Sequence, residues 1–197
     1  MTYIVQFFAM MLTALFIENI IFTRALGTSW LLYLIKKPGE LLRCTVLLTV
    51  IPLLWGAIGY PLRGLAEQSE HSYILIPMIY ILCIAVVYTG VYFFIKYVMP
   101  QTFVNAEFNL GAAAFNCAVL GSLLVPSIER LDFVSTIGYG LGMSFGFALA
   151  VIIVGFGIER LQLCRVPKAF QGLPITLIYL GLLSLAFYGL VGHQLPT

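Results

Sequence analysis

The stretch Ile79-Tyr80-Ile81-Leu82-Cys83-Ile84-Ala85-Val86-Val87 decides the fold class. Its side chains are apolar on every face, whereas the strands of a membrane β-barrel are about ten residues long and alternate apolar with polar residues. The run lies inside residues 72–95, which contain no charged residue. Because a helix needs about 20 mainly apolar residues to cross a bilayer core, the stretch predicts a membrane-spanning helix.

The whole chain has the composition of a protein surrounded by lipid. Of its 197 residues, 61% are apolar and 9% are charged, and the mean hydropathy is +1.04. A soluble domain carries about 25% charged residues. We therefore expect one all-α domain over residues 1–197, a polytopic membrane protein with connections too short to hold a soluble domain. Its six predicted transmembrane helices lie near residues 3–24, 41–62, 72–95, 106–127, 133–157 and 171–192.

The basic residues predict the orientation, because Lys and Arg remain preferentially on the cytoplasmic side of a membrane. The second and fourth connections hold two of the ten basic residues, Arg63 and Arg130. We therefore expect both termini to lie outside, on the face away from the cytoplasm. The first, third and fifth connections, with the adjoining helix ends, hold the other eight: Arg24, Lys36, Lys37, Arg43, Lys96, Arg160, Arg165 and Lys168.

The first and fourth predicted helices share a short pattern. Asn19 precedes an apolar run that reaches Leu26-Gly27, and Asn116 precedes one that reaches Leu120-Gly121, 97 positions further along the chain. Three helices per half would insert the second half upside down relative to the first. Inverted repeats of this kind place a functional site at their interface, on interrupted helices. The predicted repeat halves are about residues 1–98 and 99–197.

An interruption of the fourth helix is also predicted by its composition. Asn105, Glu107, Asn109 and Gly111 precede three alanines and Asn116, and Gly and Asn are poor helix formers. A second interpretation is that Gly111 and the alanines let two helices approach closely. Both interpretations predict a segment that faces protein.

Polar residues inside the predicted helices are the first candidates for function. Glu18 lies roughly 21 Å into the first helix at about 1.5 Å per residue, where an ionisable group is costly and by default a functional candidate. Its functional interpretation is a cation or proton site, or an anchor for an irregular turn. The alternative is a side chain that is protonated or bonded to backbone amides of a broken helix. Asn19 and Asn116 are expected to cap or bridge broken helices. Glu18, Asn19 and Asn116 are thus candidates for an ion path.

The sequence contains no P-loop, GxGxxG, HExxH or GxSxG motif, so no catalytic residue is predicted. The net charge of +2 indicates no nucleic-acid surface. The four cysteines show no CxxC or zinc spacing. Cys44 and Cys83 are expected to be packing residues, whereas Cys117 is either a metal ligand or a small core residue.

Several motifs resemble the family of Rnf and Nqr integral membrane subunits. The resemblance covers essentially the whole chain and is strongest from Asn116 onward. The outward termini and the Val-Pro-x-x-Phe loop make the chain similar to the RnfA or NqrE member rather than to RnfE or NqrD. The motifs that carry the resemblance are Phe16–Asn19, Arg24–Gly27, Asn116–Gly121, Glu159–Leu161, Val166–Gly172 and Gly181–Phe187.

The resemblance implies a multi-pass component of a prokaryotic cytoplasmic (inner) membrane complex. Such a complex is expected to pass electrons between NADH, ferredoxin or quinone and to couple this to Na⁺ or H⁺ transport. Its flavin and NADH chemistry belongs to other subunits, so this chain would be at most a non-catalytic subunit. The implied partner is a homologous RnfE- or NqrD-like membrane subunit of inverted topology.

The resemblance also implies a [2Fe–2S] cluster between the two subunits, to which each contributes two cysteines. One of these positions corresponds to Cys117. The other, two residues after Gly27, is Ser29, whose oxygen is harder to deprotonate than a thiol. Asn109 and Gly111 also depart from the family, which has an apolar, proline-containing segment there. The implied ligands are therefore Cys117 and, weakly, Ser29.

Two other functions stay open at this point. A cluster-less paralogue that transports a small solute or an ion is favoured by Ser29 and by the intramembrane Glu18. A structural assembly subunit would have no chemistry of its own.

Overall fold

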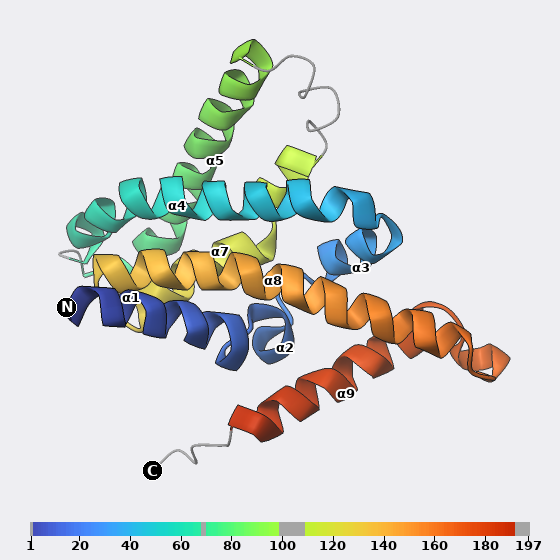
Figure 1. The fold of residues 1–197 in the computed structure, drawn as a ribbon. Coiled ribbons are helices and arrows are strands. Elements are labelled where there is room, and N and C mark those ends of the chain that lie inside the picture. Colours follow the sequence, from blue (N-terminus) through green and yellow to red (C-terminus); the bar gives the residue numbers. More distant parts are fainter. Residues whose placement is uncertain (1, 68–69, 99–108, 192–197) are drawn as a thin grey trace.

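The computed structural model describes residues 2–67, 70–98 and 109–191, and the regular structure in these parts is helical throughout (Figure 1). This confirms the predicted all-α class. In the described chain, four segments are long and apolar enough to cross a membrane, and two shorter apolar helices lie at the first and sixth predicted positions, Tyr3–Ile17 and Leu173–Gly189. The four long segments are Pro38–Gly64, Ser72–Val98, Asn109–Ile128 and Phe133–Gln162. Residues 106–108 and 192, which we predicted to be helical, and Asn105 lie outside the described residues.

Four helices begin within two residues of the predicted positions. They are α4 (Leu41–Ala66), α5 (Ser72–Val98), α8 (Phe133–Gln162) and the shorter α9 (Leu173–Val191). Short 3₁₀ turns at Pro38–Glu40 and Lys168–Phe170 precede α4 and α9.

The first predicted helix is divided into pieces. They are α1 (Thr2–Leu12), a π-helical turn (Thr13–Ile17) and α2 (Ile20–Arg24). A further helix, α3 (Thr28–Lys36), occupies a segment that we predicted to be a connection. That expectation was wrong because Leu31 and Leu34 of α3 are completely buried, and this tertiary packing stabilises a helix too short to be stable alone.

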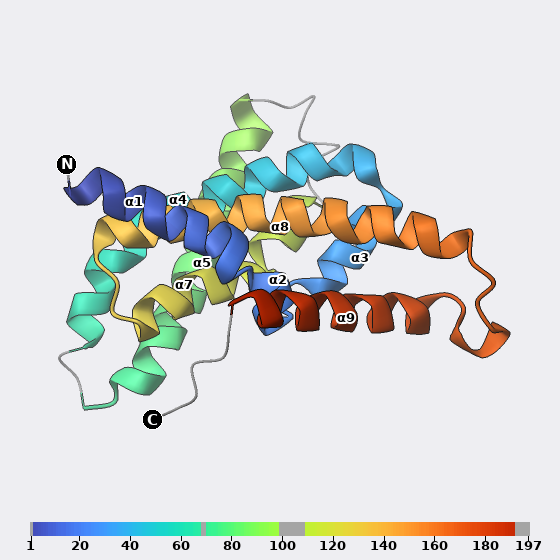
Figure 2. The ribbon, with the colours of Figure 1, turned by 60° about the horizontal axis from the view of Figure 1, so that its bottom comes forward.

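Helix α8 is central, and α1 and α4 pack along it (Figures 1 and 2). Glycines of α8 face α1. A Cβ atom added at Gly138 would lie 2.6 Å from the carbonyl oxygen of Phe7, and one at Gly142 would overlap the carbonyl of Met11. The two backbones therefore touch, as they do where small residues line the contact between membrane helices.

A proline in α4 is compensated by a side chain of α8. Pro52 lies inside α4 and has no N–H to donate to the carbonyl of Leu48, one turn earlier. The hydroxyl of Ser144 lies 2.6 Å from that carbonyl oxygen and 2.9 Å from the carbonyl oxygen of Gly140 in its own helix. Because Ser144 is fully buried, this contact satisfies a carbonyl that would otherwise be costly to bury.

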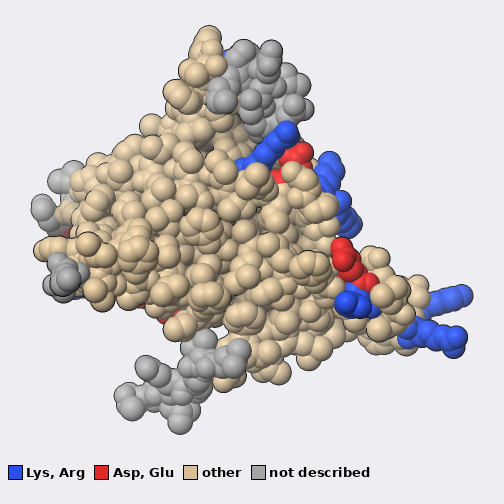
Figure 3. Space-filling view, viewed as in Figure 1, with Lys and Arg blue, Asp and Glu red and all other residues tan. Residues whose placement is uncertain are grey.

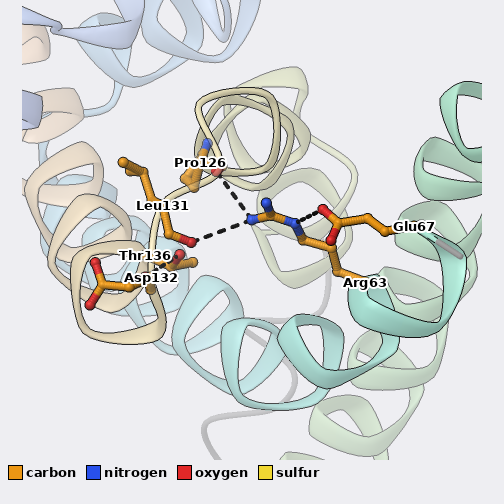
Figure 4. Close-up of polar contacts among 6 residues, drawn as sticks. All are labelled: Arg63, Glu67, Pro126, Leu131, Asp132 and Thr136. Carbon is orange, nitrogen blue, oxygen red and sulfur yellow. Dashed lines mark hydrogen bonds and ion pairs between the residues drawn. The ribbon is translucent and has the colours of Figure 1, made fainter.

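A buried arginine joins three segments at the end of α4. The Arg63 side chain donates to the Glu67 carboxylate at 2.6 Å and lies 3.4 Å from the carbonyl oxygens of Pro126 and Leu131 (Figure 4). These carbonyls belong to α7 (Cys117–Ile128) and to the turn before α8. Arg63 thus fixes the end of α4 to the connection between α7 and α8.

Many of the Lys and Arg side chains lie at one end of the molecule (Figure 3). Figure 3 shows Lys and Arg where α3 leads into α4 and where α8 leads into α9, while the opposite end is mostly uncharged in that view. Arg24, which we assigned with seven other basic residues to the first, third and fifth connections, contacts a residue of a different connection. Its guanidinium lies 3.7 Å from Glu129, in the fourth connection.

Candidate functional site at two helix breaks

The first helix break is centred on Asn19. Its side-chain oxygen accepts from the amide of Ile21 at 3.2 Å and so caps α2. Its side-chain nitrogen donates to the carbonyls of Leu15, at 3.2 Å, and of Gly146 in α8, at 2.8 Å. The Asn19 side chain is thus a cap and a bridge to the central helix, the role expected of an asparagine in an apolar segment.

The chain then turns sharply between α2 and α3. Ala25 has φ 55° and Gly27 has φ 84°, both in the left-handed region, which glycine adopts at little cost. A Cβ atom at Gly27 would also lie 2.9 Å from atoms of Ala118 and Phe147 and 3.3 Å from Oδ1 of Asn116. Gly27 is therefore required both for the turn and for the close approach of the fourth segment.

The second break lies at residues 115–116. Residues 109–114 are helical, and α7 begins at Cys117 after Asn116, whose Oδ1 accepts from the amide of Ala118 at 3.0 Å. The predicted interruption exists, but Asn109 and Gly111 do not form it. Asn109 donates instead to the Glu40 carboxylate at 2.6 Å, and the nearest atom to a Cβ at Gly111 would be the Tyr88 hydroxyl at 3.8 Å. Glu107 lies outside the described residues.

The two breaks meet at Gly27 and Cys117. The amide of Gly27 donates to the sulfur of Cys117 at 3.0 Å. Asn116 is buried and Cys117 is exposed, so the sulfur lies at the surface directly beside a buried cap.

Ser29, the other residue implied by the resemblance, lies in the first turn of α3 and is exposed. It follows Gly27 by two residues, so the two predicted ligand positions belong to the same meeting point of the breaks. An all-thiolate [2Fe–2S] cluster takes four cysteines, whereas these positions supply one thiol and one hydroxyl. The donor set of this chain therefore matches its half of an all-thiolate cluster at one of the two positions, Cys117, and departs from it at Ser29. Among the described residues, no three His, Cys, Asp or Glu side chains form a metal site.

The other cysteines lie elsewhere. Cys44 and Cys83 are buried in the hydrophobic core, as predicted, and the Trp30 indole donates to the sulfur of Cys44 at 2.7 Å. Cys164 is exposed and bonds to the carbonyl of Arg160 at 3.6 Å.

Glu18 lies at the first break but away from Cys117. Its amide donates to the carbonyl of Thr13 at 2.7 Å, while its Oε2 atom is buried and has no hydrogen-bond partner among the described residues. Burial raises the pKa of the Glu129 carboxyl, Glu18 raises it further, and Arg24 opposes this rise.

Sequence reasoning did not find the pairing of Arg24 with Glu129 or the polar group of Tyr139. The Tyr139 hydroxyl is buried without a hydrogen-bond partner among the described residues, and a single phenol between two glycines of α8 gives only a weak signal of a polar role. Glu129 follows α7 in the fourth connection, where charged residues are common, and only the folded chain brings Arg24 to it.

Comparison with known proteins extends these observations. The family model described as "Rnf-Nqr subunit, membrane protein" matches residues 7–193. The chain is 32% identical over 186 residues to the A subunit of the Na(+)-translocating ferredoxin:NAD(+) oxidoreductase complex of Acetobacterium woodii, covering 94% of this chain and 96% of that protein. It is 32% identical over 196 residues to the E subunit of the Na(+)-translocating NADH-quinone reductase of Nitrosomonas europaea, covering 93% and 96%. It is 31% identical over 179 residues to the A subunit of the ion-translocating oxidoreductase complex of Syntrophotalea carbinolica, covering 91% and 93%.

Proposed function

The chain belongs to the Rnf-Nqr family of membrane subunits, and from this premise we propose that it is the RnfA- or NqrE-like subunit of an ion-translocating oxidoreductase complex. The relatives, which are named as A or E subunits, match over nearly their full length. The chain is accordingly a multi-pass membrane protein. Its partners would be the other subunits of the complex, first among them a homologous RnfE- or NqrD-like subunit of inverted topology.

The observation that carries the proposal is the contact between Gly27 and Cys117. It joins two helix breaks that are far apart in the sequence and leaves Cys117 exposed. An exposed thiol at this junction is accessible to a second subunit, which supports a site shared with a partner.

The finer proposal concerns the cofactor. Cys117 would be one ligand of a [2Fe–2S] cluster shared with the partner subunit, and Ser29 would be a weak or lost oxygen ligand. Such a cluster supplies one-electron transfer when it is bound. The donor set has one thiol where the family pattern has two, so the partner subunit would supply most of the thiolate ligands.

The experiment is iron and acid-labile sulfide analysis, with electron paramagnetic resonance, on the complex purified through this subunit. We expect Ser29→Cys to raise the iron content and Cys117→Ser to abolish the signal of this cluster. Cys164→Ser is the matched control and should leave the signal unchanged. An intact complex without iron at this position, both in the wild type and in Ser29→Cys, would remove the cluster from the proposal.

The membrane topology is part of the same proposal. We propose six crossings, with both termini outside, made by inverted halves near residues 1–98 and 99–197 in a prokaryotic cytoplasmic membrane. The concentration of Lys and Arg at one end of the molecule supports this orientation (Figure 3). Single cysteines introduced at Tyr3 and at Lys168 test it. A membrane-impermeant thiol reagent added to intact cells should label the first and not the second.

A second function is a cluster-less transporter of an ion or a small solute. It is supported by Ser29 in place of a thiol and by the Oε2 atom of Glu18, which is buried without a hydrogen-bond partner in the part of the chain that the structure describes. Ion or solute flux into proteoliposomes that contain only this chain would favour it. Activity that requires the redox partners would favour the complex.

A further inference from the structure

A cavity lies where α8 leads into α9, at the end of the molecule that carries many of the Lys and Arg side chains (Figure 3). Its volume is about 690 Å³, and sites for small molecules usually measure about 300–1,000 Å³. Its walls are the end of α3, the last turns of α8, the connection that follows and the first turn of α9. The residues at the two helix breaks do not line it, so a molecule bound there would be distinct from any ligand at Cys117.

The length of α8 places this cavity at the depth of lipid headgroups. Its 30 residues extend about 45 Å at about 1.5 Å per residue, whereas the hydrocarbon core of a bilayer is about 30 Å thick. Residues 133–158 carry no charge, and Glu159 and Arg160 follow them in the last turns of the helix. The charged end of α8, which lines the cavity through Glu159, therefore lies outside the hydrocarbon core.

The walls combine an apolar surface with a connection that is held by its own hydrogen bonds. The side-chain nitrogen of Gln171 donates to the carbonyl of Val166 at 2.9 Å. The hydroxyl of Thr176 donates to the carbonyl of Gly172 at 3.0 Å. The wall on this side is therefore formed by the chain alone. The apolar part of the lining comes from three helices: Leu32 and Ile35 of α3, Ile158 and Leu161 of α8, and Leu173 and Ile175 of α9.

Two opposite charges line the same cavity without pairing. Lys36 is the last residue of α3, and Glu159 lies in the last turns of α8. Both side chains are exposed, and neither forms an ion pair with any described residue. Their ammonium and carboxylate groups are thus available to a molecule that carries one charge of each sign beside an apolar portion.

We propose that the cavity binds a phospholipid whose headgroup carries both a phosphate and a primary ammonium, as phosphatidylethanolamine does. Basic pockets between membrane helices bind the phosphates of lipid headgroups, and Lys36 would hold the phosphate here. Glu159 would accept hydrogen bonds from the lipid ammonium. An acyl chain would cover the apolar walls contributed by α3, α8 and α9. This lipid site requires neither the redox function nor a cluster at Cys117.

The two charges distinguish this headgroup from two other common ones. Phosphatidylglycerol offers a phosphate to Lys36 but has no cation for Glu159. Phosphatidylcholine carries both charges, but its quaternary ammonium has no N–H to donate to the carboxylate. Because a hydrogen bond between charged groups is about twice as strong as one between neutral groups, the primary ammonium should be preferred.

The test uses Cys164, an exposed thiol that lines the cavity, as a reporter of occupancy. The purified complex is reconstituted in nanodiscs of phosphatidylcholine, alone or mixed equally with phosphatidylethanolamine or phosphatidylglycerol of the same acyl chains. Mass spectrometry of the Cys164 peptide measures its rate of modification by N-ethylmaleimide. Phosphatidylethanolamine should slow this rate about fivefold relative to phosphatidylcholine, the preference expected from one hydrogen bond, and phosphatidylglycerol should slow it less.

Charge variants assign the effect to the two side chains. Lys36→Gln and Glu159→Gln should each remove most of the difference between phosphatidylethanolamine and phosphatidylcholine. Lys37→Gln is the matched control, because Lys37 is the adjacent residue, lies 5.1 Å from the centre of the Tyr33 ring and does not line the cavity. It should retain the full difference.

A pair of glycine variants tests the cavity itself. Nothing lies within 4 Å of a Cβ atom at Gly155 or at Gly181, so a side chain fits at either position, but of the two only Gly155 lines the cavity. Gly155→Leu should fill the space for the lipid and abolish the lipid dependence of the Cys164 rate while the complex remains assembled. Gly181→Leu, in α9, should leave that dependence unchanged.

Equal Cys164 rates in all three lipids would overturn the proposal, as would an unchanged lipid dependence in both Lys36→Gln and Glu159→Gln. Greater protection by phosphatidylglycerol would overturn it by assigning the cavity to an anionic lipid. A Cys164 thiol that is unreactive in every lipid would do the same, because a neighbouring subunit would then cover the cavity. None of these outcomes depends on iron content, so failure of the lipid site and failure of the proposed cluster are distinguishable.

Discussion

The amide of Gly27 donates a hydrogen bond to the sulfur of Cys117, 3.0 Å away, although 90 positions separate the two residues. The contact requires a backbone with no side chain at position 27. It also requires both helices to be broken at the same level. The candidate site therefore depends on a few residues that hold two chain breaks together.

Gly27→Ala should destabilise the protein strongly. A left-handed conformation costs an alanine about 1–2 kcal/mol, and its Cβ would lie 2.9 Å from Ala118 and Phe147, which adds about 1–3 kcal/mol of overpacking. A lowered apparent melting temperature of the detergent-solubilised complex would show this. Gly39→Ala is the control, because nothing lies within 4 Å of its Cβ position. Equal melting temperatures for the two variants would contradict the structure.

Asn19→Leu and Asn116→Leu should differ, although both residues cap helices. Asn19 also donates to the carbonyls of Leu15 and Gly146, whereas the side-chain nitrogen of Asn116 has no partner among the described residues. We expect a loss of about 2–4 kcal/mol for Asn19→Leu and of about 1 kcal/mol for Asn116→Leu. Denaturant titration of the two variants side by side measures the difference. A larger loss at Asn116 would show that its amide nitrogen is engaged in the assembled protein.

Arg63→Met should loosen the end of α4 from α7 and α8. It removes the donor to Glu67, Pro126 and Leu131, and a hydrogen bond to a charged group contributes about 1.5–3 kcal/mol. Arg43→Met provides the comparison, because its pair with Glu40 at 3.7 Å is half exposed and should contribute less than about 1 kcal/mol. Hydrogen exchange at residues 126–131 should quicken in the first variant only.

Glu129→Gln should change how stability depends on pH. Burial and then the charge of Glu18 raise the pKa of Glu129 above its ordinary value of 4.5, with Arg24 opposing them. The folded state therefore retains this proton at a pH where the unfolded chain has lost it, so stability falls as the pH rises through the window above 4.5. As the pH rises through that window, the melting temperature of the wild type should fall relative to that of Glu129→Gln.

Arg24→Gln tests the direction of the same pKa shift at Glu129. It removes the positive charge that opposes the rise in pKa, so the pH dependence should become steeper than in the wild type. A flatter dependence would mean that another group controls Glu129.

The helix breaks were predictable from sequence because an asparagine in an apolar segment has few favourable uses other than capping. Asn19 and Asn116 confirmed this, and Cys44 and Cys83 were correctly expected in the core. Asn109 was misleading because its partner, Glu40, is distant in the sequence. No local sequence pattern predicts a hydrogen bond between residues that are so far apart in the chain.

Helix α3 and the pairing of Arg24 with Glu129 were not predictable for a related reason. The buried Leu31 and Leu34 are contacts of the folded chain, and nothing in residues 28–36 alone requires a helix. Arg24 was assigned to the first connection by its position in the sequence. The break at Asn19 changes the direction of the chain, and the guanidinium of Arg24 therefore lies beside Glu129 in the fourth connection.

The pairing of Pro52 with Ser144 fixes the sliding register of two long helices. The proline leaves the Leu48 carbonyl without its usual donor at one level of α4, and the Ser144 hydroxyl reaches it from α8. A shift of one helix past the other by a single turn, about 5.4 Å, would separate the two and leave a bare carbonyl facing an apolar surface. Pro52 and Ser144 therefore favour one relative position of α4 and α8 along their axes. Replacing either residue alone removes this preference, because the unpaired carbonyl and its hydroxyl donor are needed together.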